Sequence, residues 1–220
     1  MSRNHPHTPP SEGGDRCFQP SPWTRGGEGG VRNDIFAYPT ESFYALGVDA
    51  TNPVAIRQLF RVKHREPGKP IALIAANLAQ VKKYFVMSKD EERLARKYWP
   101  GALTILLRPK KTIASQALTP LSPPSDEGGN EGGRRVRRIG VRIPAHAQAR
   151  KLALWMGVPI TATSANLSGQ PPTKSPRVLK QYFPDILQVH GRCGRQKIPS
   201  TIIRVDQTNI TILRHGAVRL

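Results

Sequence analysis

The stretch IGVRIPAHAQARKLALWMGVPITATSAN, residues 139–166, decides the fold class. It begins with an apolar run at 139–143, which is typical of a buried β-strand. Residues 147–156 predict a helix, and Gly157 supplies the left-handed cap that ends it. A second apolar run follows at 159–163 and predicts another strand. A strand, a helix and a strand in succession indicate an α/β domain.

The same alternation of strands and helices continues on both sides of this stretch. Further strands are expected at 35–39, 71–75 and 103–107, helices at 53–64, 78–85, 89–98 and 175–183, and a β pair at 201–205 and 210–214. The helix at 53–64 has Thr51 or Asn52 as its N-cap and Pro53 in its first turn. Together these elements predict a mixed β-sheet covered by helices.

Two segments of low complexity divide the chain. Residues 1–33 are rich in Gly and Pro and have no apolar period, which predicts an arm without fixed structure. A similar string occurs at 119–135, and we interpret it as a surface loop inserted into the fold. Residues 34–220 are therefore expected to form a single domain that carries this insertion.

The composition argues against several classes of protein. The 220 residues are 38% hydrophobic, and no stretch of about 18 consecutive apolar residues predicts a membrane span. The N-terminus lacks the apolar run of a secretory signal. Two cysteines, Cys17 and Cys193, are too few for a disulfide framework or a four-ligand zinc site. A reducing, cytoplasmic location fits these features best.

Positive charge is the most pronounced global property of the sequence. Lysine and arginine number 34 against 15 acidic residues, which gives a formal net charge of +19. Residues 1–37 are neutral overall and residues 112–138 carry only +1, so +18 belongs to the rest of the chain. This excess predicts an anionic partner such as nucleotide phosphates or nucleic acid. A solvated basic surface without a specific role is the alternative.

Polar residues near two predicted strands form the first candidate clusters. Thr40 and Glu41 follow the strand at 35–39, and Arg142 interrupts the strand at 139–143. Sites in α/β proteins gather at strand ends, and an arginine can pair with a carboxylate through its planar fork. Alternatively, Thr40 caps a following helix and Arg142 points to solvent.

Two further clusters suit the binding of an anion. Lys63 and Arg65 stand at the end of a predicted helix, where they either clamp a phosphate or simply complement the helix dipole. The loop at 161–169 consists of small hydroxyl and amide residues, which expose donors to an anion unless they form a plain turn. No Walker motif, no G-x-G-x-x-G after a strand and no histidine pair at i, i+4 is present, so no side-chain metal site is expected.

Six short motifs occur in the order and spacing of the YrdC-like family. They are Tyr38-Pro39-Thr40-Glu41 with Leu46-Gly47, Lys63-His64-Arg65, Trp99-Pro100-Gly101 with Leu103-Thr104, Val141-Arg142-Ile143-Pro144, Thr163-Ser164-Ala165-Asn166 with Ser168-Gly169, and Pro199-Ser200-Thr201-Ile202. The chain resembles this family over about residues 35–111 and 136–217. The resemblance implies a twisted, mixed α/β sheet around a basic concave cleft, and the activity of a threonylcarbamoyl-AMP synthase of tRNA modification.

The resemblance also implies the reaction and its participants. L-threonine and bicarbonate or CO₂ give a carbamate, whose carboxylate attacks the α-phosphorus of ATP. The products are threonylcarbamoyl-AMP and pyrophosphate, and Mg²⁺ is bound through the ATP phosphates. A downstream tRNA threonylcarbamoyl transferase complex is the implied partner, with contact to tRNA or other RNA as a further expectation.

Site residues follow from the motif positions. The implied ATP-binding residues are Lys63, Arg65, Ser164, Asn166 and Arg214. The implied threonine-binding residues are Thr40, Arg142, Ala162 and Ser200. Lys63 and Arg65 are also the implied catalytic residues, because they spread the charge that develops on the phosphates.

Two other interpretations share these motifs. A non-catalytic YrdC-like protein could grip RNA through the same basic cleft, and its affinity would fall steeply with salt. Such a protein would not need the hydroxyl set Thr40, Ser164 and Ser200, which is complete here. A member of the family that has lost activity is the remaining alternative.

Overall fold

A computed structural model describes residues 34–65, 70–114, 117–118, 130–131, 134–135, 137–207 and 209–220. The predicted arm at 1–33 and most of the predicted insertion at 119–135 lie outside these residues. The helices are α1 (Pro53–Val62), α2 (Leu78–Tyr84), α3 (Lys89–Tyr98), α4 (Ala147–Met156) and α5 (Pro176–Tyr182). The strands are β1 (Phe36–Pro39), β2 (Tyr44–Gly47), β3 (Ala72–Ile74), β4 (Phe85–Val86), β5 (Leu103–Pro109), β6 (Asn130–Glu131), β7 (Arg134–Arg135), β8 (Ile139–Arg142), β9 (Ile160–Ser164), β10 (Leu187–Gln188), β11 (Thr201–Asp206) and β12 (Asn209–Arg214).

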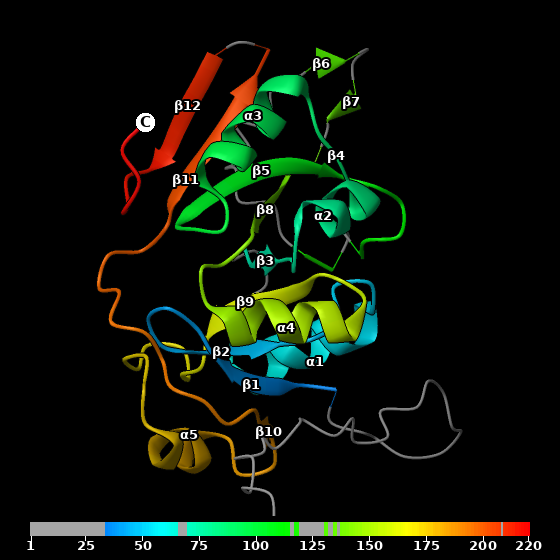
Figure 1. Cartoon of the computed structure of the whole chain (residues 1–220). Coiled ribbons are helices and arrows are strands. Elements are labelled where there is room, and N and C mark those ends of the chain that lie inside the picture. The colour runs from blue at the N-terminus through cyan, green and yellow to red at the C-terminus, as the bar shows by residue number, and fades with distance from the viewer. Residues whose placement is uncertain are drawn as a thin grey trace, which may run out of the picture. The chain divides into compact units, whose positions relative to one another are not determined.

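Ten of these strands form one mixed sheet (Figure 1). Its order is β10-β1-β2-β9-β3-β8-β5-β11-β12, and β4 pairs with β5 beside this path. The pairs β1–β10, β3–β8 and β5–β11 are parallel, while the other neighbours are antiparallel. The expected mixed α/β sheet is therefore confirmed. Within the insertion, β6 and β7 pair with each other as a separate two-stranded ladder.

The helices begin and end where their capping residues stand. Asn52 is the N-cap of α1, since its side chain accepts hydrogen bonds from the backbone of Val54 and Ala55. Ser88 and Glu91 form a capping box at the start of α3. Gly157 ends α4 with φ +71°, which is the left-handed cap that the sequence predicts. None of the helices in the ranges described is long and apolar enough to cross a membrane.

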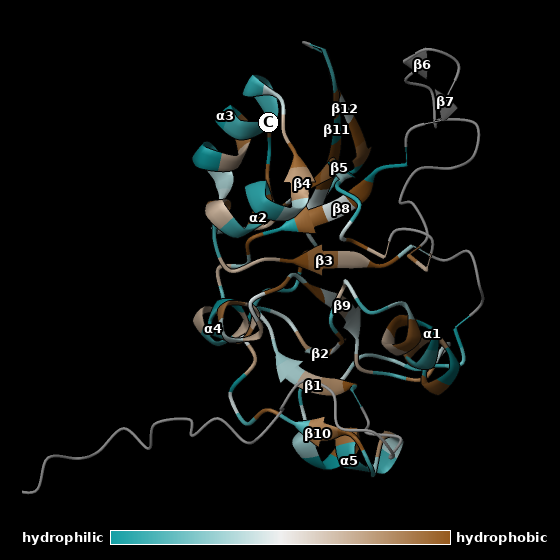
Figure 2. Cartoon of the chain, turned by 90° about the vertical axis from the view of Figure 1, so that its right-hand side faces the viewer, coloured by the Kyte–Doolittle hydropathy of each residue, from teal (hydrophilic) through white to brown (hydrophobic). Residues whose placement is uncertain are grey.

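Helices cover the sheet on both sides. Figure 2 shows α4 and α1 on opposite sides of β1, β2 and β9. Phe36 and Tyr38 of β1 belong to the hydrophobic cluster of α4, in which Leu152 is buried. Ala37 points the other way and belongs to the larger cluster, which includes Ile56 of α1. This alternation along one strand is the reason that both faces of the sheet are buried.

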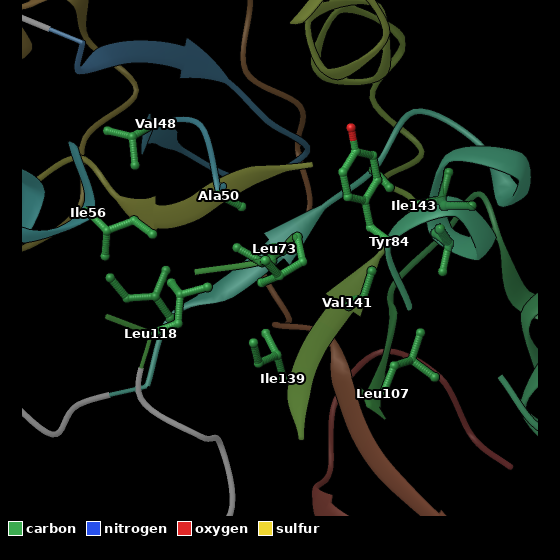
Figure 3. Close-up of a cluster of buried hydrophobic side chains, with 14 of the residues drawn as sticks. Val48, Ala50, Ile56, Leu73, Tyr84, Leu107, Leu118, Ile139, Val141 and Ile143 are labelled. Carbon is green, nitrogen blue, oxygen red and sulfur yellow. The ribbon is translucent and has the colours of Figure 1, made fainter. Parts of the chain in front are cut away.

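The larger cluster holds the centre of the sheet in place. Figure 3 shows Leu73, Ile139 and Val141 lying between Ile56 on one side and Leu107 on the other. All five side chains are at most 1% exposed. Their packing keeps β3, β5 and β8 in register, and so it determines where Arg142, the last residue of β8, is placed.

Three short strands differ from the prediction. The residues after Thr40 form β2 instead of a helix, so the alternative that Thr40 caps a helix is wrong. The Thr40 hydroxyl donates to the Phe43 carbonyl at 2.7 Å and closes the turn of the β1–β2 hairpin. The strands β4 and β10 have two residues each, and pairing with distant β5 and β1 creates them.

Candidate functional site

A cavity of about 330 Å³ opens among the central strands and the chain that leads into β11. Residues from eight separate segments line it, which are Glu41, Ser42, Arg65, Pro70, Ile71, Ala72, Leu73, Ile74, Thr104, Arg142, Ala162, Thr163, Ser164, Gln196, Ile198, Pro199, Ser200, Ile202 and Arg214. The sheet brings these segments together because β9, β3, β8, β5 and β11 are consecutive neighbours within it. The cavity is therefore a product of the sheet order.

Positive charge dominates the lining of this cavity. Arg65, Arg142 and Arg214 contribute three guanidinium groups, against the single carboxylate of Glu41. Burial lowers the pKa of Arg65 and of Arg214, and the charge of Arg142 lowers the pKa of Arg214 further. Three guanidinium groups against one carboxylate give the described lining an excess of positive charge, which favours the binding of an anion.

Arg142 and Glu41 form an ion pair at the wall of the cavity. The Arg142 Nη2 atom lies 3.3 Å from Glu41 Oε2, and the two side chains are only 16% and 11% exposed. Glu41 Oε1 accepts a hydrogen bond of 2.6 Å from the backbone N–H of Ala145. Arg142 thus points into the cavity, which decides between the two interpretations of its position in the strand.

Arg214 and Ser200 form a second polar group on the other side of β5. The Arg214 guanidinium donates to the Ser200 carbonyl at 2.8 Å and to its hydroxyl at 3.1 Å. The Ser200 hydroxyl also lies 2.9 Å from the hydroxyl of Thr104, which is 2% exposed. The strand β5 therefore holds Ser200 in place through Thr104.

Lys63 lies at the end of α1 but does not line the cavity. It is 2% exposed, and its ammonium donates to the Ser164 carbonyl, to the Asn166 carbonyl at 2.8 Å and to Asn166 Oδ1 at 2.7 Å. Burial, together with the charge of Arg65, lowers the pKa of Lys63 to about 8. Lys63 is therefore neither a solvated cation at the end of a helix nor a cation that is free to bind phosphate. Its ammonium group is bonded to the loop that follows β9 and holds that loop in place.

That loop presents some of its predicted residues to the cavity and turns others away. Ser164 lines the cavity together with Ala162, while Asn166 does not. The Ser164 hydroxyl donates to Asn166 Oδ1 at 2.6 Å, and Asn166 Nδ2 donates to the Gln170 carbonyl. The small residues are thus held in a fixed, hydrogen-bonded loop.

Thr40 is 6% exposed and is absent from the cavity lining. Its hydroxyl closes the hairpin turn and accepts from the Ser42 N–H at 3.3 Å. Its carbonyl accepts from the Gly194 N–H at 2.8 Å, which ties the turn to the chain before β11. Thr40 therefore places its neighbour Glu41 at the cavity wall.

The structure brings together six of the nine predicted site residues at the cavity. They are Arg65, Arg142, Ala162, Ser164, Ser200 and Arg214. Thr40, Lys63 and Asn166 hold the surrounding backbone instead. The predicted set lacks Glu41, Thr104 and Gln196, which also line the cavity. Glu41 and Thr104 lie within the quoted motifs, whereas nothing in the sequence around Gln196 distinguishes it.

No cluster of three or more His, Cys, Asp or Glu side chains suited to a metal ion occurs in the part of the chain that the structure describes. The one carboxylate on the cavity wall is already bonded to Arg142 and Ala145. The cavity thus fits an anionic ligand better than a directly coordinated divalent cation.

Comparison with known proteins gives a consistent result. A family model for Sua5, YciO and YrdC, which is described as "Telomere recombination", matches residues 31–216. A curated threonylcarbamoyl-AMP synthase of Chromobacterium violaceum is 33% identical over 179 residues, which cover 80% of this chain and 84% of that protein. A synthase of the same name from Idiomarina loihiensis is 35% identical over 158 residues, covering 70% of this chain and 77% of its own.

Solved structures show the same architecture. Sua5 of Pyrococcus abyssi in complex with L-threonine has a TM-score of 0.69 and 29% identity, and the match covers 84% of this chain. This chain spans 51% of that longer protein. YciO of Escherichia coli, with a TM-score of 0.65 and 24% identity, supports the fold alone. Because the family model covers most of the residues and the curated relatives exceed 30% identity, the chain belongs to the Sua5/YciO/YrdC family.

Proposed function

We propose that this protein is a threonylcarbamoyl-AMP synthase, a nucleotidyltransferase that forms L-threonylcarbamoyladenylate and pyrophosphate from L-threonine, bicarbonate or CO₂, and ATP. The names of the curated relatives support this activity, as does the L-threonine held by the similar Pyrococcus abyssi protein. The observation that carries the proposal is a cavity lined by three guanidinium groups, those of Arg65, Arg142 and Arg214, and by one carboxylate, that of Glu41.

The lining suits a reaction between two anions. The carboxylate of threonine carbamate attacks the α-phosphorus of ATP, and pyrophosphate leaves. Arg65 and Arg214 are assigned to the phosphates, and Arg142 to the threonine carboxylate, because a guanidinium can bind such groups through two parallel hydrogen bonds. The described lining offers no cysteine, histidine or lysine as a covalent nucleophile. Because the carbamate carboxylate itself attacks ATP, the reaction needs no covalent nucleophile from the protein, and positioning and electrostatic stabilisation supply the rate.

The remaining predicted residues receive roles in the same proposal. Ser200 and the backbone of Ala162 are assigned to threonine, and Ser164 to the nucleotide. Thr40 and Asn166 do not line the cavity, so contact of Thr40 with threonine or of Asn166 with the nucleotide requires a rearrangement of the hydrogen bonds that hold them. Lys63 is assigned to the ATP phosphates as a catalytic cation. Its ammonium is already bonded to oxygens of Ser164 and Asn166, so contact with ATP requires an exchange of these oxygens for phosphate oxygens.

Mg²⁺ belongs to the proposal as a companion of ATP. The carboxylate of Glu41 is engaged by Arg142 and Ala145, so the cavity wall supplies no free acidic ligand. Mg²⁺ coordination through ATP phosphates and water is the arrangement that this lining allows.

The product must pass to a second enzyme. A mixed anhydride of a carbamate and AMP is an activated acyl donor, and we assign its consumption to a downstream tRNA threonylcarbamoyl transferase complex in the cytoplasm. Exposed cations in the segment that leads to the lining residue Gln196, namely Arg192 and Arg195, and Lys174, which donates to the Gly194 carbonyl, favour contact with tRNA as well. A non-catalytic RNA-binding protein would use the same surface, and the assay below separates the two.

Pyrophosphate release tests the proposal. The purified protein is supplied with ATP, Mg²⁺ and bicarbonate, with or without L-threonine, and the nucleotide product is identified by mass. Threonine-dependent pyrophosphate and threonylcarbamoyl-AMP are expected. Pyrophosphate that forms equally without threonine, or no product with all substrates present, would overturn the proposal. RNA binding without turnover would favour the non-catalytic alternative.

A further inference from the structure

Glu41 is the only acidic residue among the described residues that line the cavity. We propose, resting on the function above, that Glu41 receives the ammonium group of the amino-acid substrate and accepts a proton from it. Glu41 is then the base that makes the substrate nitrogen nucleophilic. This assigns a catalytic role to a residue that lies next to the threonine-contacting position Thr40.

Charge complementarity between this pair and an amino acid is the first argument. An α-amino acid carries a carboxylate and an ammonium group on the same carbon atom. The cavity wall presents the matching pair, since Arg142 Nη2 and Glu41 Oε2 lie 3.3 Å apart. A substrate carboxylate on the Arg142 guanidinium therefore has its ammonium group beside the Glu41 carboxylate.

The second argument is that Glu41 has free acceptor capacity. Each of its oxygens has one described partner, the Ala145 N–H for Oε1 and Arg142 for Oε2. An ionised carboxylate has about four lone-pair sites, so further donors can be accepted. The side chain of Glu41 is only 11% exposed, which strengthens its interaction with a cation relative to one in water.

The chemistry of carbamate formation supplies the third argument. Threonine is bound as an ammonium ion, which has no lone pair to attack carbon. The ammonium N–H bond breaks and its proton moves to the Glu41 carboxylate. The freed amine forms an N–C bond to bicarbonate, and a C–O bond of bicarbonate breaks. The departing hydroxide takes the second proton from nitrogen and leaves as water. Charge balances, with a carbamate anion and a neutral Glu41 as products.

The other groups around Glu41 keep their charge in this step. Arg142 of β8 faces it, and Arg65 and Arg214 share the cavity, all as cations. Burial raises the pKa of Tyr38 of β1 and of Cys193, so both stay protonated near neutral pH. The remaining lining residues carry hydroxyl, amide or apolar side chains. None of these lining groups accepts a proton at neutral pH. Lys63, whose pKa is lowered to about 8, does not line the cavity, so Glu41 is the base there.

A purely structural role is the competing explanation. Glu41 could serve only to orient Arg142, and its loss would then weaken the binding of any carboxylate ligand equally. The variant Glu41→Gln separates the two roles, because glutamine keeps an oxygen for the Ala145 N–H but cannot take a proton. Asp206→Asn is the matched control. Asp206 is paired with Arg138 at 3.2 Å and Arg204 at 2.6 Å and does not line the cavity.

The first test measures the binding of two ligands to the protein by calorimetry, in the absence of ATP and bicarbonate. The ligands are L-threonine and 2,3-dihydroxybutanoate, in which a hydroxyl replaces the amine. We expect the wild type and Asp206→Asn to prefer threonine by about tenfold or more, and Glu41→Gln to lose this preference. Equal weakening of both ligands in Glu41→Gln would show a structural role and overturn the inference.

The pH dependence of turnover is the second test. Without a base, the variant depends on threonine that is already deprotonated in solution. The ratio of variant to wild-type rate is therefore expected to rise about tenfold per pH unit between pH 7 and 9. Lys63 titrates in both proteins, so it cancels in this ratio. A ratio that is constant with pH would overturn the inference, whereas an inactive wild type would instead refute the proposed function.

Discussion

Arg142 shows how one side chain becomes functional through its place in a strand. Its neighbours Val141 and Ile143 are 0% and 4% exposed, so alternation turns Arg142 away from the apolar core. A charged side chain in this position points either to solvent or into a cleft. The order of the strands in the sheet places the Arg142 side chain at the cavity. The guanidinium is then partly desolvated, which strengthens its attraction for a substrate carboxylate.

Replacing Arg142 is expected to weaken threonine binding. The variant Arg142→Ala removes a charge-assisted contact worth about 1.5–3 kcal/mol, so the KM for threonine rises by about 10- to 100-fold. Arg142→Lys keeps the charge but not the planar fork, so its KM for threonine is expected to lie between those of the wild type and Arg142→Ala. Initial rates of pyrophosphate release at varied threonine measure this effect. An unchanged KM in Arg142→Ala would remove Arg142 from the threonine site.

Lys63 is expected to make stability depend on pH. Its pKa is lowered to about 8 in the folded protein, against 10.5 for an unperturbed lysine. Between these values the unfolded chain binds more protons, so the contribution of Lys63 to the free energy of unfolding rises with pH. The slope is at most about 1.4 kcal/mol per pH unit.

Urea unfolding at pH 7 and pH 9.5 measures this dependence. The stability of the wild type minus that of Lys63→Met is expected to be larger at pH 9.5. Lys89→Met, at an exposed position on α3, is the control for replacing a lysine on the surface. If this difference in stability did not change with pH, the charged form of Lys63 would not be disfavoured in the folded protein, and the prediction would be wrong.

At the scale of elements, the segment between β10 and β11 forms one wall of the cavity. It contributes Gln196, Ile198 and Ser200 to the lining and contains no long helix or strand. Two backbone hydrogen bonds tie it to the β1–β2 turn, from Gly194 to Thr40 at 2.8 Å and from Gln196 to Glu41 at 3.0 Å. The position of Glu41 therefore depends on how closely this segment approaches the turn.

Gly194→Ala is expected to disturb threonine binding, because it prevents the segment between β10 and β11 from packing closely against the β1–β2 turn. A Cβ atom at Gly194 would stand 2.4 Å from the Glu41 carbonyl oxygen, which is backbone and cannot move away cheaply. Relief requires the segment to shift, so we expect a several-fold rise in the KM for threonine and a loss of about 1–3 kcal/mol in stability. Substrate titrations and thermal melts measure the two effects.

Gly157→Ala is the matched control for a glycine substitution. Gly157 has φ +71° at the end of α4, and a Cβ atom there meets nothing within 4 Å. The strained backbone is expected to cost about 1–2 kcal/mol while the KM for threonine stays unchanged. If Gly194→Ala left threonine binding equally unaffected, the segment would not determine the position of Glu41.

At the scale of the whole molecule, the sheet gathers part of the net charge of +19 into one binding cavity. Arg65, Arg142 and Arg214 lie far apart in sequence but share one cavity. Mutual repulsion of these cations disfavours the folded protein without a ligand. A bound polyanion relieves the repulsion, so ligand binding and stability are coupled in this protein.

ATP is therefore expected to raise the melting temperature. At 100 times Kd a ligand stabilises the folded state by about 2.7 kcal/mol, which for a domain of this size corresponds to roughly 5–10 °C. Scanning calorimetry with and without Mg²⁺–ATP measures the shift. The double variant Arg65→Ala, Arg214→Ala is expected to lose most of it. A full shift in this variant would place the nucleotide outside the cavity.

The sequence predicts well those elements that local interactions specify. Caps and apolar periods place α1 and α4 within a few residues, because Asn52 and Gly157 act on the backbone beside them. The strands β2, β4 and β10 are missing from the prediction. β4 and β10 have only two residues each and become strands because they pair with β5 and β1, whereas β2 forms a hairpin with β1 where a turn or helix start is the expected structure. Local pattern alone therefore cannot supply the complete sheet.

By itself the sequence determines the α/β class, the basic character and the short motifs of the site, because these depend on residue identity and local spacing. Only the tertiary structure decides which motif residues face the cavity. Lys63 and Thr40 are held by oxygens of their own surroundings, while Glu41 reaches the wall beside Arg142. The physical reason is that hydrogen bonds and burial across the sheet orient each side chain, and these partners lie more than a hundred residues away in the chain for Lys63 and Glu41.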